Sequence, residues 1–272
     1  MSAQTRAEDL RNRLNSGESV LMPGVWDPLS ALIVQQSGFS TAFVSGFAVS
    51  GTLLGRPDVG YLTQTEMAEV AQRVCSSVPT LNVIVDADTG YGDPMTVRRT
   101  VELWEQAGAA GLFLEDQVWP KKCGHMDGKQ VVPREDWLAK LRAACDHREY
   151  LYVTARTDAR AAVSLDEAIE RAKMARDCGV DALFVEAPQS VEEMEAIANS
   201  LPDITLVANM VEKGKTPLLT PNELAELGFR LIVSPLSLLL SAVQAMSTAA
   251  QRLADVGSLR TYLADVAPFD SF

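Results

Sequence analysis

A repeating order of hydrophobic and polar positions divides the chain into short units. In four segments a helical pattern ends on a glycine, a short apolar run follows within a few residues, and small or polar residues come next. These segments are 36–46, 106–116, 177–187 and 226–235. A glycine after a helix supplies its left-handed C-terminal residue, and a fully apolar run is typical of a strand buried on both faces. The repeat predicts helices that alternate with parallel strands.

Further apolar runs and helical patterns lie between these segments. The additional predicted strands are 19–22, 81–85, 150–154 and 204–207, and the predicted helices include 63–75, 94–107, 133–144, 165–178, 191–199 and 221–227. Thr63 followed by Glu66 is typical of a capping box, and Pro94 and Pro221 suit the first position of a helix. The pattern therefore predicts eight strands alternating with helices.

Eight such units in 272 residues predict a single (β/α)8 barrel of the TIM type that spans residues 1–272. A doubly wound open sheet is the alternative. The first predicted strand-to-helix turn, 23–28, lacks the GxGxxG pattern, and no GxxxxGK[ST] sequence occurs. We therefore favour the barrel and expect disorder only at the two ends.

Composition and charge narrow the classes of function. The net charge of −12 argues against a nucleic-acid binder, which relies on clustered positive charge. No apolar run approaches the length of a membrane span, and the first ten residues lack the apolar core of a signal peptide. The four cysteines include no CxxC pair, and we expect Cys75, Cys145 and Cys178 to be structural free thiols. We expect a cytoplasmic protein that binds neither membranes nor nucleic acids.

Polar residues follow most of the predicted strands. In a barrel of this type the active site lies at the carboxyl ends of the strands. Asp86, Asp88 and Glu115 form an oxygen-only set that suits Mg²⁺ or Mn²⁺ better than zinc, although Asp88 could instead only cap the turn 89–92. The other polar residues at strand ends are Ser45, Gly46, Asp116, Arg156, Asp158, Glu186, Asn209, Glu212 and Ser234. Arg156 could bind a substrate carboxylate, or it could balance the surrounding acids.

The loop after Glu115 carries the most distinctive group of residues. Lys121 and Lys122 precede Cys123, and His125 follows two residues later. A thiol beside two ammonium groups should have a lowered pKa and could act as a proton donor or nucleophile, whereas the alternative is a solvated loop with an incidental cysteine. For His125 a role in the site and a role in stabilising the loop remain open.

Five motifs give the chain a specific resemblance. Segments 86–92, 115–117, 121–125, 155–158 and 209–217 resemble the isocitrate lyase/phosphoenolpyruvate mutase superfamily, and the resemblance extends over about 23–237. It implies a (β/α)8 barrel whose eighth helix is exchanged between subunits, a C-terminal helical extension, and a homotetramer built as a dimer of dimers. It also implies a mobile active-site loop at about 118–131.

The resemblance implies roles for individual residues as well. Asp86 would bind Mg²⁺ (or Mn²⁺) directly, with Asp88 and Glu115 acting through waters. Cys123, on the mobile loop, would be the acid/base that closes over a small carboxylate substrate. The other residues assigned to catalysis or substrate binding are Phe43, Ser45, Gly46, Phe47, Asp58, Lys121, Gly124, His125, Arg156, Glu186 and Asn209.

Within the superfamily the chain looks most like the 2-alkylmalate lyases, such as 2,3-dimethylmalate lyase. The mutase that makes phosphonopyruvate carries an Asn-Ser loop where this chain has Lys-Cys-Gly-His, and methylisocitrate lyases have Tyr and Gly where this chain has Phe43 and Phe47. The resemblance implies Mg²⁺-dependent cleavage of a 2-alkylmalate or methylisocitrate-type 2-hydroxy acid to a 2-oxo acid and a carboxylate. The alternatives are a carboxyphosphonoenolpyruvate or phosphoenolpyruvate phosphonomutase, an oxaloacetate hydrolase, and a barrel that has lost its activity and only binds.

Overall fold

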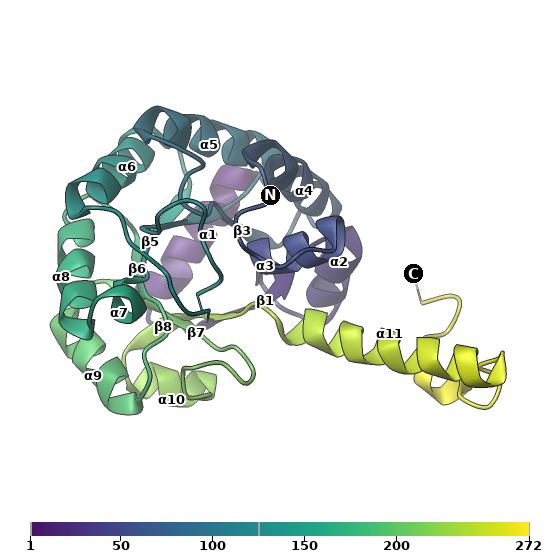
Figure 1. The fold of residues 1–272 in the computed structure, drawn as a ribbon. Coiled ribbons are helices and arrows are strands. Elements are labelled where there is room, and N and C mark those ends of the chain that lie inside the picture. The colour runs from purple at the N-terminus through teal and green to yellow at the C-terminus, as the bar shows by residue number, and fades with distance from the viewer. Residues whose placement is uncertain (1, 125, 272) are drawn as a thin grey trace.

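The computed structural model describes residues 2–124 and 126–271 (Figure 1). Within this part of the chain, parallel strands β1 to β8 pair in sequence order, and β8 pairs with β1 to close a barrel. The predicted (β/α)8 barrel is therefore confirmed. The strands are β1 Val20–Val25, β2 Thr41–Val44, β3 Asn82–Asp86, β4 Gly111–Glu115, β5 Tyr152–Thr157, β6 Ala182–Val185, β7 Thr205–Asn209 and β8 Phe229–Ser234.

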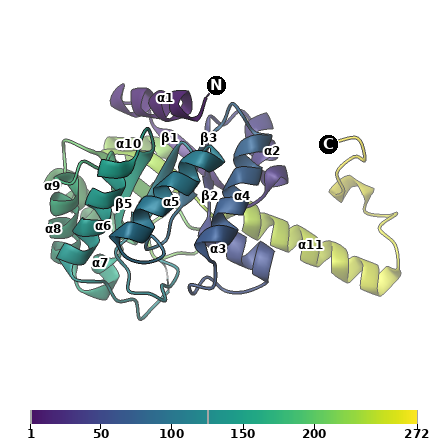
Figure 2. The ribbon, with the colours of Figure 1, turned by 90° about the horizontal axis from the view of Figure 1, so that it is seen from above.

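Helices surround the barrel and bury their apolar faces against the strands (Figures 1 and 2). Thr63 and Glu66 form the predicted capping box at the start of α4, and Pro94 begins α5 as expected. The surrounding helices are α2 Pro28–Gln36, α4 Gln64–Ser77, α5 Pro94–Ala107, α6 Arg134–His147, α8 Leu165–Arg176, α9 Val191–Ser200 and α10 Pro221–Glu226. Short helices α3 Gly46–Val49 and α7 Ala159–Ala162 and the π turn η1 Ser50–Leu54 follow β2 and β5.

The N-terminal segment, where the sequence predicted no helix, forms α1 Ala3–Asn15. Figure 2 shows this helix across the amino end of the barrel. Leu10 and Leu14 lie one turn apart and join the apolar cluster inside the barrel. Arg6 donates hydrogen bonds to the carbonyl oxygens of Pro79 (3.0 Å) and Gly108 (2.7 Å). Because α1 closes the end opposite the strands' carboxyl ends, it contributes to stability rather than to a site.

Strand β5 extends further than the apolar pattern predicted. Its last residues pair with β4, and Arg156 lies beside Glu115 in the ladder. Glu115 and Arg156 are thus still paired as strand residues at the carboxyl end of the barrel and do not belong to the loops that follow. Arg156 is consequently held by a strand, which fixes its direction more firmly than a loop would.

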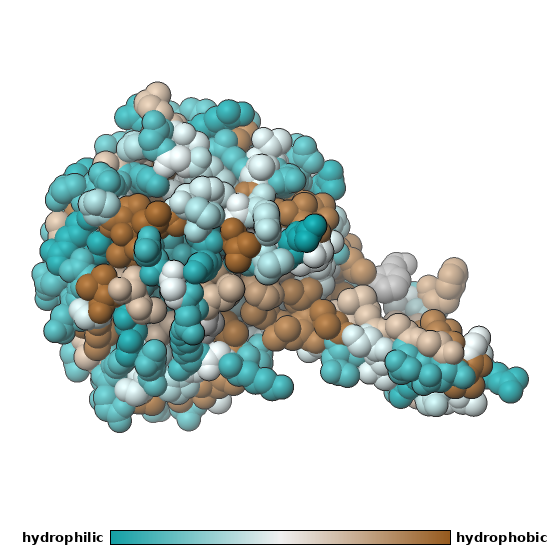
Figure 3. Space-filling view, in the orientation of Figure 1, coloured by the Kyte–Doolittle hydropathy of each residue, from teal (hydrophilic) through white to brown (hydrophobic). Residues whose placement is uncertain are grey.

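Helix α11, Ser237–Val256, extends away from the barrel (Figures 1 and 2). Leu239 is its buried residue, whereas Leu240, Val243, Met246 and Leu253 are exposed along it. Apolar surface continues from the barrel onto this helix (Figure 3). A short 3₁₀ turn, η2 Leu263–Asp265, lies beyond it. None of the described helices is both long and apolar enough to span a membrane.

Candidate active site

A pocket opens at the carboxyl ends of the strands and contains about 50 Å³ of free space. One water needs roughly 10 to 15 Å³ of such space, so the pocket has room for a small molecule. The structure brings most of the predicted site residues to its lining. These are Phe43, Ser45, Phe47, Asp58, Asp86, Glu115, Lys121, Cys123, Gly124, Arg156, Glu186 and Asn209.

Two predicted residues lie beside the pocket rather than in its lining, and a third lies outside the described residues. The backbone N–H of Gly46 donates to Asp86 Oδ2 at 3.3 Å, and a Cβ at this position would stand 2.9 Å from the same oxygen. Asp88 is buried behind Asp86, and its backbone N–H donates to Asp86 Oδ1 at 3.1 Å. His125 is the predicted site residue that lies outside the described part of the chain.

Lys121 forms a buried bridge between two carboxylates. Its Nζ lies 2.6 Å from Asp58 Oδ1 and 2.6 Å from Asp88 Oδ1, and its side chain is 4% exposed. Burial lowers the pKa of Lys121, but Asp88 and Asp58 outweigh it and hold that pKa well above its usual range. The ammonium group stays charged and orients both carboxylates. Burial, assisted by Asp86 and Asp58, nevertheless raises the pKa of Asp88 to about 7.

Arg156 stands at the centre of the opposite side of the pocket. Asp158 accepts from its Nε and Nη2 at 3.0 and 3.1 Å, Glu115 Oε2 lies 3.4 Å from Nε, and Glu186 Oε2 lies 3.3 Å from Nη2. Its guanidinium also covers the ring of Phe184, 5.4 Å from the centroid. Burial opposes the charge, yet these carboxylates keep the pKa of Arg156 well above its usual range. The site therefore contains a fixed, permanently charged guanidinium group that is bound by three protein carboxylates.

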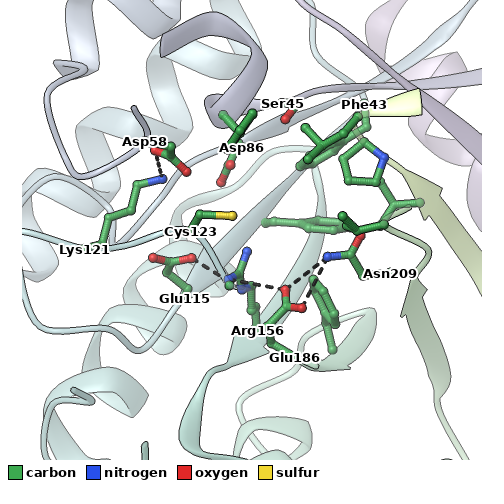
Figure 4. A pocket seen from close by; sticks show the side chains of 18 of the residues that line it. Phe43, Ser45, Asp58, Asp86, Glu115, Lys121, Cys123, Arg156, Glu186 and Asn209 are labelled. Carbon is green, nitrogen blue, oxygen red and sulfur yellow. Dashed lines mark hydrogen bonds and ion pairs between the residues drawn. The ribbon is translucent and has the colours of Figure 1, made fainter. Parts of the chain in front are cut away.

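Glu186 and Asn209 connect this arginine to β7. Asn209 Nδ2 donates to both Glu186 oxygens at 3.3 Å (Figure 4). Glu186 is fully buried. The pair lines the pocket together with Arg156, with Val211, which follows β7, and with Val233 of β8.

The carboxylates provide ligands for a hard cation, although not a complete protein cage. Within residues 2–124 and 126–271, no three Asp, Glu, His or Cys side chains gather closely enough to hold an ion among themselves. Asp88 is turned toward Lys121 instead. However, Glu115 Oε1 is buried without a hydrogen-bond partner among the described residues, and burial raises the pKa of Glu115 well above its usual range. Asp86 reaches the pocket directly. This donor set fits Mg²⁺, which binds one or two carboxylates and retains waters.

The Cys123 loop folds back over these residues. The backbone N–H of Cys123 donates to the Asp58 carbonyl at 3.1 Å, and the Gln117 side chain holds the backbone N–H and C=O of Lys122 at 2.9 and 2.8 Å. Figure 4 shows the thiol pointing into the pocket between Asp86 and Arg156. The ammonium group of Lys121 binds Asp58, and that of Lys122 donates to the Gly128 carbonyl oxygen. Adjacency in sequence alone therefore does not establish that either ammonium group acts on the thiol. The lowered pKa expected for Cys123 remains a prediction.

Aromatic and aliphatic side chains form the remaining wall. The rings of Phe43 and Phe113 are tilted by 39° with centroids 4.8 Å apart, and Phe184 meets Phe113 edge-on at 5.7 Å. The sequence analysis missed Phe113 and Phe184, although both stand two residues before a predicted acid and so share its face of the strand. The other lining residues that it missed are Val211, Val233, Pro235 and Leu236, whereas Lys122, which also lines the pocket, was named only as a neighbour of the thiol.

Comparison with known proteins identifies the family of this chain. A profile of the phosphoenolpyruvate phosphomutase family matches residues 10–254. The chloroplastic carboxyvinyl-carboxyphosphonate phosphorylmutase of Arabidopsis thaliana is 48% identical over 93% of this chain and 76% of its own length. The petal death protein of Dianthus caryophyllus is 47% identical over 93% and 80%, and the 2,3-dimethylmalate lyase of Eubacterium barkeri is 42% identical over 88% and 83%.

Solved structures show the same fold. An oxaloacetate acetylhydrolase with bound 3,3-difluorooxalacetate has a TM-score of 0.94 and 35% identity, and it covers 98% of this chain and 92% of its own. A phosphonopyruvate hydrolase with oxalate and Mg²⁺ has a TM-score of 0.86 and 26% identity, covering 99% and 93%. The chain thus belongs to the phosphoenolpyruvate phosphomutase family, within the phosphoenolpyruvate mutase/isocitrate lyase superfamily of enzymes that includes named lyases.

Proposed function

We propose that this chain is a Mg²⁺-dependent carbon–carbon lyase that cleaves a 2-alkylmalate or methylisocitrate-type 2-hydroxy acid to a 2-oxo acid, such as pyruvate, and a carboxylate. The observation that supports it best is the position of the Cys123 thiol, which points into a pocket between Asp86 and Arg156 (Figure 4). One side of that pocket suits carboxylates, and the aromatic wall suits an alkyl branch. A malate with an alkyl substituent has both features.

Arg156 would bind the carboxylate of the 2-oxo-acid half. Asp158 fixes its orientation through two hydrogen bonds, so little conformational entropy is lost on binding. Ser45 and Asn209 line the same part of the pocket and would hydrogen-bond the substrate oxygens. The alkyl branch would lie against Phe43 and Phe47.

Asp86 would hold Mg²⁺ directly, with Asp88 and Glu115 binding its waters. When bound, Mg²⁺ supplies Lewis-acid stabilisation of negative charge on the 2-oxygen. A relative with bound oxalate and Mg²⁺ supports this assignment. Around Lys121 and Arg156 the buried carboxyl groups outnumber the buried positively charged side chains, which also favours binding of a divalent cation in the pocket.

Cys123 would deliver the proton that completes cleavage. As the C2–C3 bond breaks, its electron pair moves into the leaving fragment, which becomes a carboxylate enediolate with two negative charges. Glu115, whose Oε1 is buried without a hydrogen-bond partner among the described residues, would accept the 2-hydroxyl proton, and the thiol proton would be transferred to the departing carbon. The loop must cover the pocket at this moment, because water would otherwise compete as a proton source.

Substitution of Cys123 tests this role. We expect Cys123→Ser to lower kcat at least about 10²-fold, the usual contribution of a positioned general acid, while Mg²⁺ and oxalate still bind. Cys178→Ser is the matched control, because Cys178 lies at the end of α8 outside the pocket. Full activity of Cys123→Ser would contradict the assignment. An undiminished rate in excess chelator would contradict the proposal that Asp86 binds a catalytic metal ion.

A phosphonomutase reaction is the second candidate, because a relative with 48% identity carries a phosphorylmutase name. Oxaloacetate hydrolysis is a third, supported by the likeness to oxaloacetate acetylhydrolase. A substrate panel with Mg²⁺ separates the three: 2,3-dimethylmalate, other 2-alkylmalates and 2-methylisocitrate, then oxaloacetate, then carboxyphosphonoenolpyruvate and phosphonopyruvate. Turnover of only the last pair would replace the lyase proposal.

We further propose a homotetramer in which α11 packs on a neighbouring subunit. The exposed apolar residues Val243 and Met246 lie on a helix whose buried residue is Leu239. We expect Val243→Glu with Met246→Glu to dissociate the assembly in sedimentation velocity, whereas Gln244→Glu, at an exposed polar position between them, leaves it intact. A wild-type monomer would contradict the proposal.

A further inference from the structure

Lys129 has an unusual environment for a residue of a surface loop. Its side chain is 1% exposed, and its Nζ lies 2.7 Å from Asp158 Oδ1 and donates to the carbonyl oxygen of Gly124. Burying an ammonium group costs a large desolvation free energy, which only well-placed partners offset. No step of the proposed reaction uses it, so its position needs another explanation.

The carboxylate that Lys129 binds also holds Arg156. Asp158 Oδ1 accepts both from Lys129 and from Arg156 Nη2, and Oδ2 accepts from Arg156 Nε. Asp158 is itself fixed to the barrel, because its backbone N–H donates to Asp116 Oδ1 at 2.8 Å and Asp116 pairs with Arg171 at 3.1 Å. Lys129 thus connects the loop to a carboxylate that is itself anchored to the barrel.

The second partner of Lys129 lies directly after the thiol residue in sequence. Gly124 sits so close to the floor of the pocket that a Cβ there would stand 2.5 Å from Glu186 Cδ and 2.6 Å from Arg156 Nη2. Its carbonyl is held by Lys129, and the preceding N–H, that of Cys123, is held by the Asp58 carbonyl. The thiol residue is therefore fixed from both sides, by Asp58 on one and by Lys129 on the other.

We propose that Lys129 is a positioning residue that locks the 118–131 loop over the pocket and couples its closure to Arg156 through the shared carboxylate of Asp158. The inference rests on the proposed function in one respect, the role of Cys123 as proton donor. Lys129 makes no contact with the reacting atoms. It acts by holding Gly124, and hence the thiol, at a constant place relative to the carboxylate-binding arginine.

The other two lysines of the loop have different tasks. Lys121 bridges Asp58 and Asp88 on the far side of the pocket, and Lys122 donates to carbonyl oxygens of its own loop, those of Asp127 and Gly128. Neither is shown to bind the carboxylate that orients Arg156. Loss of Lys129 is thus expected to release the loop while Arg156 keeps its bonds to Asp158.

The rate of Cys123 alkylation tests the lock without relying on turnover. Iodoacetamide labelling of the full-length protein is followed by mass spectrometry of the Cys123 peptide, with and without oxalate and Mg²⁺. We expect Lys129→Met to raise the labelling rate at least about tenfold and Lys129→Gln to give an intermediate rate. Lys215→Met is the matched control: its partner Asp127 is 93% exposed, so the rate should stay within about twofold of wild type.

Hydrogen exchange separates a lock from general destabilisation. In Lys129→Met we expect faster exchange in peptides of 118–124 and unchanged exchange in α6. Equal labelling rates in Lys129→Met and wild type would overturn the proposal, and so would faster exchange in α6 as well, which would make Lys129 an ordinary stabilising residue. If the wild-type protein turns over no 2-hydroxy acid, the proposed function fails while the labelling result still decides the lock. If turnover is normal and labelling is unchanged, only the lock fails.

Discussion

The Lys121 bridge allows a prediction whose magnitude follows from the structure. Lys121→Met retains the length of the side chain but removes the charge between Asp58 and Asp88, whose oxygens each lie 2.6 Å from the same nitrogen. Those oxygens are therefore at most about 5 Å apart, and two unit charges at that distance would repel by about 3 kcal/mol at an effective dielectric constant of 20. Because the pKa of Asp88 is already raised to about 7 and Lys121 opposes that rise, this repulsion acts in full only at a pH where Asp88 stays ionised without the lysine. Breaking a buried ion pair costs about 3 to 5 kcal/mol in general.

We therefore expect Lys121→Met to lower the free energy of unfolding by about 3 to 5 kcal/mol, a drop in Tm of roughly 10 °C for a chain of this size. Differential scanning calorimetry of both proteins, at one protein concentration and with chelator present, measures this difference in Tm. Asp58→Asn in the same background should recover part of the loss, because it removes one of the two repelling charges. Lys122→Met is the matched control, since the Lys122 ammonium group donates to two carbonyl oxygens of its own loop, at 3.1 and 3.3 Å.

A Tm for Lys121→Met within about 2 °C of wild type would refute the reasoning, because it would mean that the two carboxylates tolerate each other without the lysine. An equal drop in Lys122→Met would also refute it, since loss of any loop lysine would then suffice. A double variant as unstable as the sum of both single variants would show that Asp58 and Lys121 are not coupled.

Two further predictions concern the residues around Arg156. Burial opposes ionisation of Asp158, but Arg156 and Lys129 lower its pKa from 3.8 to about 2, so the folded state binds this proton more weakly than the unfolded state. About 2 kcal/mol of stability should therefore be present above pH 4 and be lost as the pH falls toward 2, and Asp158→Asn should flatten that part of the urea-midpoint profile; an unchanged profile would contradict it. Gly124→Ala should lower kcat/KM about 10²-fold with little change in Tm, because the added methyl group displaces the loop from Glu186, and an unaltered rate would show that the loop is seated elsewhere during turnover.

The barrel was largely predictable because its signals are local. Apolar runs, glycines after helices and the capping box at Thr63 each depend on a few neighbouring residues, and all were confirmed. Helix α1 was missed because its buried face consists of few apolar residues in a polar segment, chiefly Leu10 and Leu14. The end of β5 was placed too early because Arg156 is polar, while its pairing partner lies on another strand.

The sequence predicted which residues form the candidate site but not which of them contact one another. Acids at strand ends and the thiol loop are visible in the sequence, since parallel strands in a barrel bring their carboxyl ends together. The sequence could not show that Lys121 would bind Asp58 and Asp88. Nor could it show that Lys129 would reach Asp158.

The sequence by itself determined the fold class, the oxygen-rich rim of the barrel and the loop that carries Cys123. Only the tertiary structure decided which charges pair, which aromatic rings face the substrate space, and that α11 extends away from its own barrel. The physical reason is the range of the forces involved. Periodicity and capping are fixed within one or two turns of chain, whereas ion pairing and burial depend on which distant segments barrel closure brings together.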